Sequence, residues 1–232
     1  MIIDSKLTFA LAAAMFLVGC STTTHKTPAT TPEALNAPVS ATMPADAAQP
    51  FFVHEARLPA DFPPAGPIGT VIVKSYPPCR VATVLAADVK GQGQDRLFMP
   101  LFDHIQKEKI AMTSPLVMDF SVTDSAAADP PQPPIAMSLI YSSQNVGELE
   151  KAGVVTVHDL PAISVLSVGV RGSYDGEHFE AGMKLIARWL AAYPNSYKIA
   201  GPPRFLGYNS PFVPWFLRYG EVQVPVKIRR AE

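Results

Sequence analysis

A repeat at an offset of 84 residues constrains the fold of this chain more than any other feature. Residues 72–84 and 156–168 share one pattern, in which β-branched residues lie on both sides of a central proline. The matched positions are Val73 and Val157, Pro77 and Pro161, Val81 and Val165, and Val84 and Val168. Such runs around a proline are typical of two strands joined by a turn. Each copy therefore predicts a β-hairpin.

A helical pattern follows both copies at the same offset. Apolar residues recur there at helical spacing, namely Phe98, Leu101, Phe102 and Ile105 in the first copy and Phe179, Met183, Ile186 and Leu190 in the second. Pro100 has no amide hydrogen, so it is expected in the first turn of its helix or at a kink. Each hairpin is therefore predicted to lead directly into a helix.

Strand-like runs come after each helix. They span residues 116–122 and 135–141 in the first half, and 204–208 and 221–228 in the second. Residues 124–134 are rich in Ala and Pro and predict an exposed loop. The chain thus predicts an α+β fold of two repeated hairpin, helix and strand-pair units, at about 69–142 and 153–228. Their strands are expected to form a curved or barrel-like sheet with the helices packed outside.

Residues 1–19 predict a secretion signal, because Lys6 precedes an apolar run at 7–18. This run is shorter than the roughly 20 residues of a membrane-spanning helix, so no such helix is expected. The run ends in Leu17, Val18, Gly19 and Cys20, which resembles a bacterial lipobox and predicts lipidation of Cys20. Acyl chains contribute about 0.8 kcal/mol per buried CH₂ and would hold the protein on a membrane. The alternative is a simple signal peptide with a chance cysteine.

The mature chain is predicted to begin with lipidated Cys20 and a disordered tether over residues 20–50. The tether is rich in Ser, Thr, Ala and Pro and cannot bury enough apolar surface to fold. Residues 51–232 form the predicted domain, in which Cys79 has no cysteine partner for a disulfide. The net charge of −1 gives no indication of a nucleic-acid partner. Ser21, where aspartate would indicate inner-membrane retention, favours the periplasmic face of the outer membrane.

Two further motifs carry a family resemblance. Residues 109–115 (KIAMTSP) and the block 207–215, followed by Arg218 and Glu221, resemble the two signatures of the SOUL haem-binding family, in the same order. The resemblance extends from about 69 to 227. It implies a distorted β-barrel and non-catalytic binding of haem or a related tetrapyrrole in a hydrophobic groove. Some members place a histidine beside the tyrosine that matches Tyr76, whereas this chain has Ser75 there.

A haem groove needs apolar walls, cationic or polar groups for the propionates and, optionally, an axial ligand. The residues that could supply these are Phe98, Leu101, Phe102, His104, Ile105, Met112, Tyr208, Phe212, Trp215 and Arg218. The candidates for iron ligation are His104, His158 and Met112. Several of these residues have a structural alternative. Met112 could pack in the core, His158 could be solvated, Arg218 could pair with Glu221, and the aromatic block could cap the barrel.

Patterns that would indicate catalysis do not occur in the sequence. It has no metal-ligand spacing of Cys and His, no phosphate-binding glycine loop and no serine nucleophile motif. We therefore expect a lipid-anchored envelope protein that binds a tetrapyrrole and is not an enzyme. The alternative is a SOUL-fold interaction or stress-related lipoprotein that does not bind haem and recognises a protein or another apolar ligand. An enzyme acting on tetrapyrroles is a third option.

Overall fold

The computed structural model describes residues 49–120, 133–210 and 212–229, all within one compact unit, Pro38–Glu232. The predicted signal peptide, Cys20, nearly all of the tether and most of the loop at 124–134 lie outside these residues. In the part of the chain that is described, no helix is both long and apolar enough to cross a membrane.

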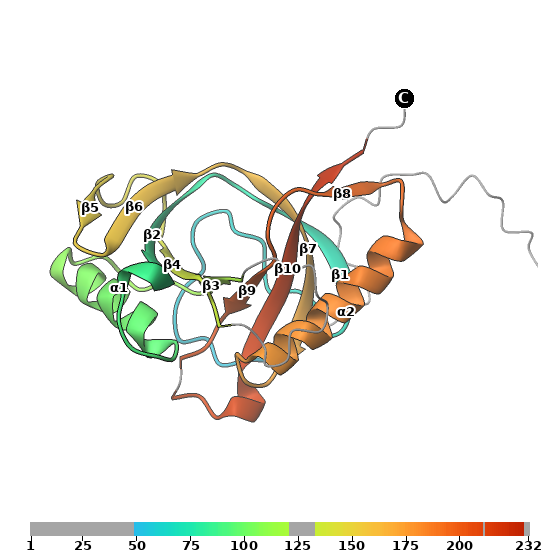
Figure 1. Cartoon of the computed structure of the whole chain (residues 1–232), viewed down its shortest axis with the longest axis horizontal. Coiled ribbons are helices and arrows are strands. Elements are labelled where there is room, and N and C mark those ends of the chain that lie inside the picture. Colours follow the sequence, from blue (N-terminus) through green and yellow to red (C-terminus); the bar gives the residue numbers. More distant parts are fainter. Residues whose placement is uncertain (1–48, 121–132, 211, 230–232) are drawn as a thin grey trace, which may run out of the picture. The chain divides into compact units, whose positions relative to one another are not determined.

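Two helices and a ten-stranded sheet make up the fold, which confirms the α+β class (Figure 1). The strands are β1 (Val71–Tyr76), β2 (Cys79–Leu85), β3 (Leu116–Asp119), β4 (Ala136–Ile140), β5 (Lys151–Ala152), β6 (Val155–Leu160), β7 (Ile163–Arg171), β8 (Tyr197–Ile199), β9 (Arg204–Gly207) and β10 (Tyr219–Ile228). The helices are α1 (Asp95–Lys107) and α2 (Gly176–Ala192), with short 3₁₀ turns η2 (Ala86–Asp88) and η3 (Trp215–Leu217).

The prediction of a hairpin in each copy is wrong. Strands β1 and β2 follow each other in the chain but pair with β7 and β6, respectively, instead of with each other. Val71 lies opposite Val168 and Cys79 opposite Leu160, so the two proline-containing segments run antiparallel along each other in one register. Prolines cannot donate a ladder hydrogen bond. They therefore interrupt a long two-stranded ribbon where a turn was expected.

The sheet is not closed into a barrel. Its strand order is β1-β7-β10-β9-β3-β4-β2-β6-β5, with β8 beside β10, so that β1 and β5 are its edges. All its pairs are antiparallel. The predicted strand pairs that follow each helix do form, as β3 with β4 and β9 with β10. Figure 1 shows the sheet as a curved arch, with α1 and α2 at its two ends.

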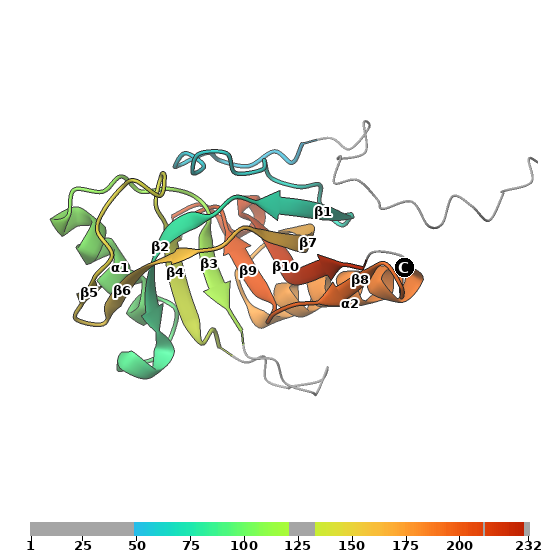
Figure 2. The same ribbon diagram turned by 90° about the horizontal axis from the view of Figure 1, so that it is seen from above.

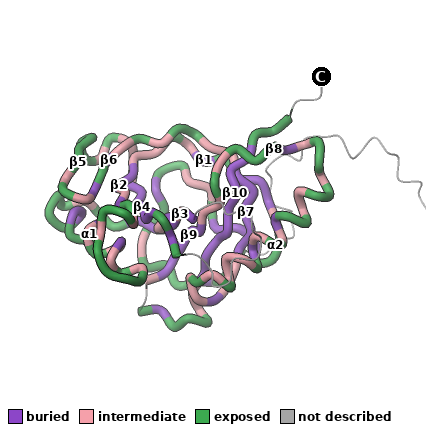
Figure 3. Tube along the Cα trace, in the orientation of Figure 1, coloured by how far each residue is buried: buried purple, intermediate pink, exposed green. Residues whose placement is uncertain are grey.

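Alternating side chains divide the sheet into two faces, as strand geometry requires. Ala82, Leu139 and Leu166 point to the face that carries both helices, where α1 packs on β2, β4 and β6, and α2 packs on β7 and β10. The neighbouring residues Val81, Ile140 and Val165 point to the opposite face and belong to a second core cluster. Most buried residues follow the strands (Figure 3). Both faces of the sheet are thus covered.

The segment of residues 49–68 covers the second face. Phe52 stacks on Tyr219 with ring centroids 5.0 Å apart, and Phe62 meets Tyr76 edge-on at 5.1 Å. In Figure 2 this segment lies on one side of the sheet and α2 on the other. Glu221 fixes the end of the covering segment, because one of its carboxylate oxygens accepts hydrogen bonds from the Gly66 amide at 2.7 Å and from Lys74 Nζ at 2.6 Å. The segment is therefore anchored to the sheet by both packing and charge.

Pro100 is the sixth residue of α1, in its second turn and not its first. The helical spacing of the sequence correctly located both helices, and their apolar sides face the sheet. Leu101, Ile105 and Ile186 are almost fully buried there. Because these side chains fill the core between helix and sheet, they are structural.

Candidate functional site

A small cavity lies on the second face, where the prolines interrupt the ribbon. Its volume is about 150 Å³. The ribbon contributes one wall through Pro77 and Pro161, and Phe62 of the covering segment contributes another. The remaining lining residues come from seven strands and from the turn between β6 and β7, and they are largely apolar: Tyr76, Cys79, Val81, Val117, Asp119, Ser138, Ile140, Leu160, Ala162, Ile163, Arg204 and Leu206. The cavity thus lies opposite to the helices.

Arg204 provides the positive charge of this cavity. It begins β9, and its guanidinium lies 5.4 Å from the centre of the Tyr76 ring. Its Nε donates to the Gln223 side chain at 3.0 Å. This bond fixes the plane of the guanidinium. A planar, fixed guanidinium suits a carboxylate. The cavity can therefore bind an apolar molecule that carries an acid group.

Burial changes the acid–base behaviour of the other polar groups in the cavity. Burial raises the pKa of the Asp119 carboxyl, an effect that the nearby Arg204 partly reverses. Burial also raises the pKa of the Cys79 thiol, which Arg204 again opposes. A protonated thiol is a poor nucleophile and a poor metal ligand. Cys79 is therefore an apolar wall and not a reactive group.

A hydrogen-bonded network lies behind the Tyr76 wall. Gln223 Nε2 donates to the Tyr76 hydroxyl at 2.7 Å and to Glu221 at 2.8 Å. Glu221 also accepts from Ser167 and from the Tyr219 hydroxyl. Burial raises the pKa of Tyr76 well above its ordinary value, and the charge of Glu221 adds to this effect. The tyrosine hydroxyl is thus neutral and already bonded, so it positions the cavity wall.

The structure does not bring the ten predicted groove residues together. Those of the first helix belong to the other face, where Leu101, His104 and Ile105 are buried against the sheet. Phe98 is half-buried and stacks on Phe102, whose side chain is 36% exposed. None of these residues lines the cavity. Helical periodicity identified the core-facing side of α1, which is equally consistent with packing and with a ligand groove.

Residues of the closing block are also dispersed. Tyr208 is buried in the second core cluster, beneath Phe52. Phe212 and Trp215 are 94% and 60% exposed, on the loop that carries η3. Arg218 donates through Nε to the carbonyl of Val213 at 2.7 Å, which holds that loop together. Glu221 pairs with Lys74 and not with Arg218, contrary to the structural alternative from the sequence.

The three predicted iron ligands occupy different places. His104 is a buried residue of α1, and its side chain lies on the helix face of the sheet. Met112 lies in the loop between α1 and β3 and is 37% exposed. His158 lies in β6 directly opposite Val81, and side chains of such a pair share one face. His158 is therefore the only one of the three on the cavity face, two residues from Leu160 of the lining.

The sequence analysis missed the residues that give this cavity its chemistry, Arg204 and Asp119. They lie directly opposite each other in β9 and β3. A usable signal was present: if the two proline segments are placed antiparallel, their prolines meet and leave a gap in the ladder. Arg204, at the start of a predicted strand, gave no comparable signal.

The family of the chain is shown by comparison with known proteins. A family model described as SOUL heme-binding protein matches residues 69–225. The chain belongs to this family. The match confirms the predicted resemblance, and it suggests haem or tetrapyrrole binding for this SOUL protein without indicating any catalytic family. No curated protein is similar to the chain in sequence.

Solved structures support the fold of this SOUL domain. The crystal structure of the EcmrR C-terminal domain matches with a TM-score of 0.51 and 16% identity, covering 68% of this chain and 97% of that one. The chain in the cryo-EM structure of the EcmrR–DNA complex in EcmrR-RPo matches with a TM-score of 0.53 and 14% identity. That match covers 68% of this chain and 57% of the EcmrR chain. At this identity the likeness concerns the fold alone.

The cavity fits a tetrapyrrole in chemistry but not in volume. Apolar walls and one guanidinium match a ring that carries carboxylates. Its 150 Å³ is below the roughly 300 Å³ at which pockets for drug-sized ligands begin. The cavity has room for only one part of such a ring, and the rest would extend beyond the lining residues.

Proposed function

We propose that this SOUL protein binds haem or a related tetrapyrrole at the proline-flanked cavity, without catalysis, as a lipid-anchored protein of the cell envelope. The observation that carries the proposal is the fixed guanidinium of Arg204 inside a largely apolar cavity. Apolar surface provides most of the affinity for a flat ring. A charge-assisted bond from Arg204 to a carboxylate orients it.

Binding by apolar contact explains the site better than axial ligation of iron. The cavity lining contains neither histidine nor methionine among the described residues. The Cys79 thiol is held protonated, and the Tyr76 hydroxyl is bonded to Gln223. His158 is the single predicted ligand on the same face. A role for iron therefore depends on His158 alone.

A titration with haemin and with metal-free protoporphyrin IX tests this proposal. The full-length protein is expected to bind both at about one equivalent with similar affinity, because the ring and its carboxylates provide the contacts. Arg204→Gln is expected to weaken both at least about tenfold, since hydrogen bonds to charged groups contribute about 1.5–3 kcal/mol. The control is Arg188→Gln, the same change on the exposed side of α2, which should bind like the wild type.

Three results would change this conclusion. Absence of saturable binding to either ligand overturns the proposal, as does equal affinity in the Arg204 and Arg188 variants. Tighter binding of haemin than of protoporphyrin, lost in His158→Asn, would replace apolar contact with iron ligation.

A smaller apolar carboxylate is the second candidate, and the volume of the cavity favours it. A largely apolar cavity of about 150 Å³ is large enough for a single aromatic ring. In that case the protein would bind benzoate in an Arg204-dependent manner and fail to bind haemin. This result would show that the cavity is the binding site but that its ligand is not a tetrapyrrole. It would support the alternative of a SOUL-fold protein that recognises another apolar ligand.

A further inference from the structure

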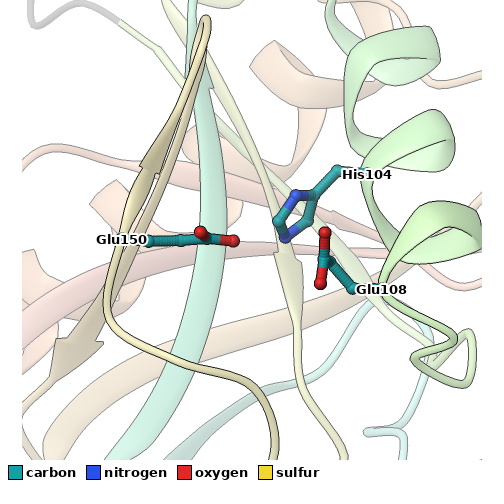
Figure 4. A group of neighbouring side chains, drawn as sticks. All are labelled: His104, Glu108 and Glu150. Atoms are coloured by element: carbon teal, nitrogen blue, oxygen red, sulfur yellow. The ribbon is translucent and has the colours of Figure 1, made fainter.

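A second group of chemically active side chains lies on the helix face, away from the cavity. His104 in α1, Glu108 directly after α1, and Glu150 in the segment before β5 each direct one ligand atom to the same point (Figure 4). These three atoms lie within 4.8 Å of one another. The group is independent of the proposed tetrapyrrole site, because its residues contribute nothing to the cavity lining.

Local structure explains why the three residues meet. His104 and Glu108 are four residues apart, which places them on one side of the last helical turn. The Glu108 amide donates to the His104 carbonyl at 2.9 Å, so this turn is closed. Glu150 is held from the other side, where its carbonyl accepts the Val157 amide at 2.8 Å. Two separate elements thus fix the group.

The imidazole is held in place, as that of a metal ligand needs to be. His104 is 6% exposed, and its Nε2 lies 2.7 Å from the Tyr141 hydroxyl. This contact fixes the position of the ring. Both carboxylates lie beside the same ring, since one ligand atom of each and one of His104 are all within 4.8 Å of one another.

The charges at this point favour a cation. Glu108 and Glu150 bring two negative charges to the C-terminal end of α1, where the helix dipole is also negative. Lys107 contacts Glu108 at 3.1 Å, but its side chain is 76% exposed and such surface pairs contribute little. Two carboxylates and a helix C-terminus repel one another unless a positive charge is bound.

We propose that His104, Glu108 and Glu150 bind a divalent first-row transition metal ion, such as Zn²⁺. One imidazole nitrogen and two carboxylate oxygens suit these ions, and bonds of about 2.0–2.2 Å place two ligands of one ion at most about 4.4 Å apart. The two glutamates are exposed, so their side chains are free to rotate, and binding would bring the three atoms from within 4.8 Å of one another to that spacing. The ion would tie the end of α1 to the segment before β5, with its other positions open to water.

Calorimetric titration of the full-length protein with Zn²⁺ tests this site. The wild type is expected to bind one equivalent with saturation. Glu108→Gln and Glu150→Gln each keep the size of the side chain and remove a ligand charge, and both residues are exposed, so these variants should fold. Each is expected to weaken binding at least about tenfold, since even the loss of an outer-shell partner costs 10–100-fold.

Glu148→Gln is the matched control, because Glu148 is an exposed carboxylate two residues from Glu150 and outside the group. It should bind Zn²⁺ like the wild type. Titration with Co²⁺ provides a second readout, because thiolate ligation by Cys20 or Cys79 would give an intense near-ultraviolet band that this site lacks. Equal Zn²⁺ affinity in all three variants and the wild type, no saturable binding, or a thiolate band that persists in both glutamate variants would overturn the proposal.

Discussion

At the scale of single residues, the buried pair of Lys74 and Glu221 connects the covering segment to the sheet. Both side chains are almost fully buried, and their charged atoms lie 2.6 Å apart. Glu221 also accepts the Gly66 amide, which belongs to the covering segment. Ionised groups persist in such a place only when they are paired and fully hydrogen-bonded. The pair is thus a local requirement of the fold.

Substitution of Glu221 by glutamine is expected to destabilise the protein by about 3–5 kcal/mol, because it leaves the Lys74 charge buried without its partner. The measurement is urea unfolding at pH 7. Glu180→Gln removes the carboxylate of an exposed pair with Lys184 and should change the free energy of unfolding by less than about 0.5 kcal/mol. Equal effects of the two substitutions would contradict this account.

The same variant carries a pH signature. Burial favours the neutral carboxyl of Glu221, but Lys74 and the hydrogen bonds outweigh it and hold its pKa below the usual 4.5. A carboxyl whose pKa is lowered in the folded state stabilises the protein above its unfolded pKa, and this stabilisation is lost as the pH falls through the folded pKa. The difference between the wild type and the Glu221→Gln variant should therefore narrow below about pH 4.5.

At the scale of elements, the sequence located helices and strands well but not all of their partners. Periodicity is a local property, so the apolar spacing at Leu101 and Ile186 was sufficient to place α1 and α2. Strand pairing is nonlocal. The proline segments around Pro77 and Pro161 fit a hairpin and an interrupted ribbon equally well, because both need extended residues on each side of a proline. The hairpin and the interrupted ribbon differ only in whether one repeat copy pairs with the other.

The contact between α2 and the sheet depends on Gly182. A Cβ at this position would lie 2.6 Å from Val222 Cβ in β10. Alanine favours a helix over glycine by up to about 1 kcal/mol, but overpacking of a core contact costs about 1–3 kcal/mol. We therefore expect Gly182→Ala to destabilise the protein, measured as a lower thermal midpoint.

A double-mutant cycle separates the two effects. Val222→Gly removes the Cβ and both methyl groups that the new Cβ would meet. In that background Gly182→Ala should be neutral or stabilising, because only the gain in helix propensity remains. A loss of the same size in both backgrounds would show that the close contact is not the cause.

At the scale of the whole molecule, the sequence predicted the family, but it did not predict the residues that line the cavity. The family signatures at 109–115 and 207–215 hold structural positions: Thr113 donates to the Ile140 carbonyl, and Asn209 accepts the Tyr219 amide. These signatures therefore stabilise the fold. The sequence analysis had instead assigned the apolar residues near them to a ligand groove. The cavity instead depends on residues brought together by strand order, such as Arg204 and Asp119. Their proximity cannot be read from spacing along the chain.

The proposed attachment to a membrane rests on the lipobox that ends at Cys20. Residues 21–50 would link the lipid to the domain, and a flexible chain of this length spans roughly 30 Å on average. Cys20→Ser should release the protein from the membrane fraction into the soluble fraction and abolish incorporation of labelled palmitate. Cys79→Ser is the control, because the Cys79 thiol lies in the cavity wall and should not affect attachment. If the Cys20 variant stays with membranes, another part of the chain binds them. Haemin affinity should be the same in the Cys20 variant and the wild type, since Cys20 lies 42 residues before Phe62, the first residue of the cavity lining in the sequence.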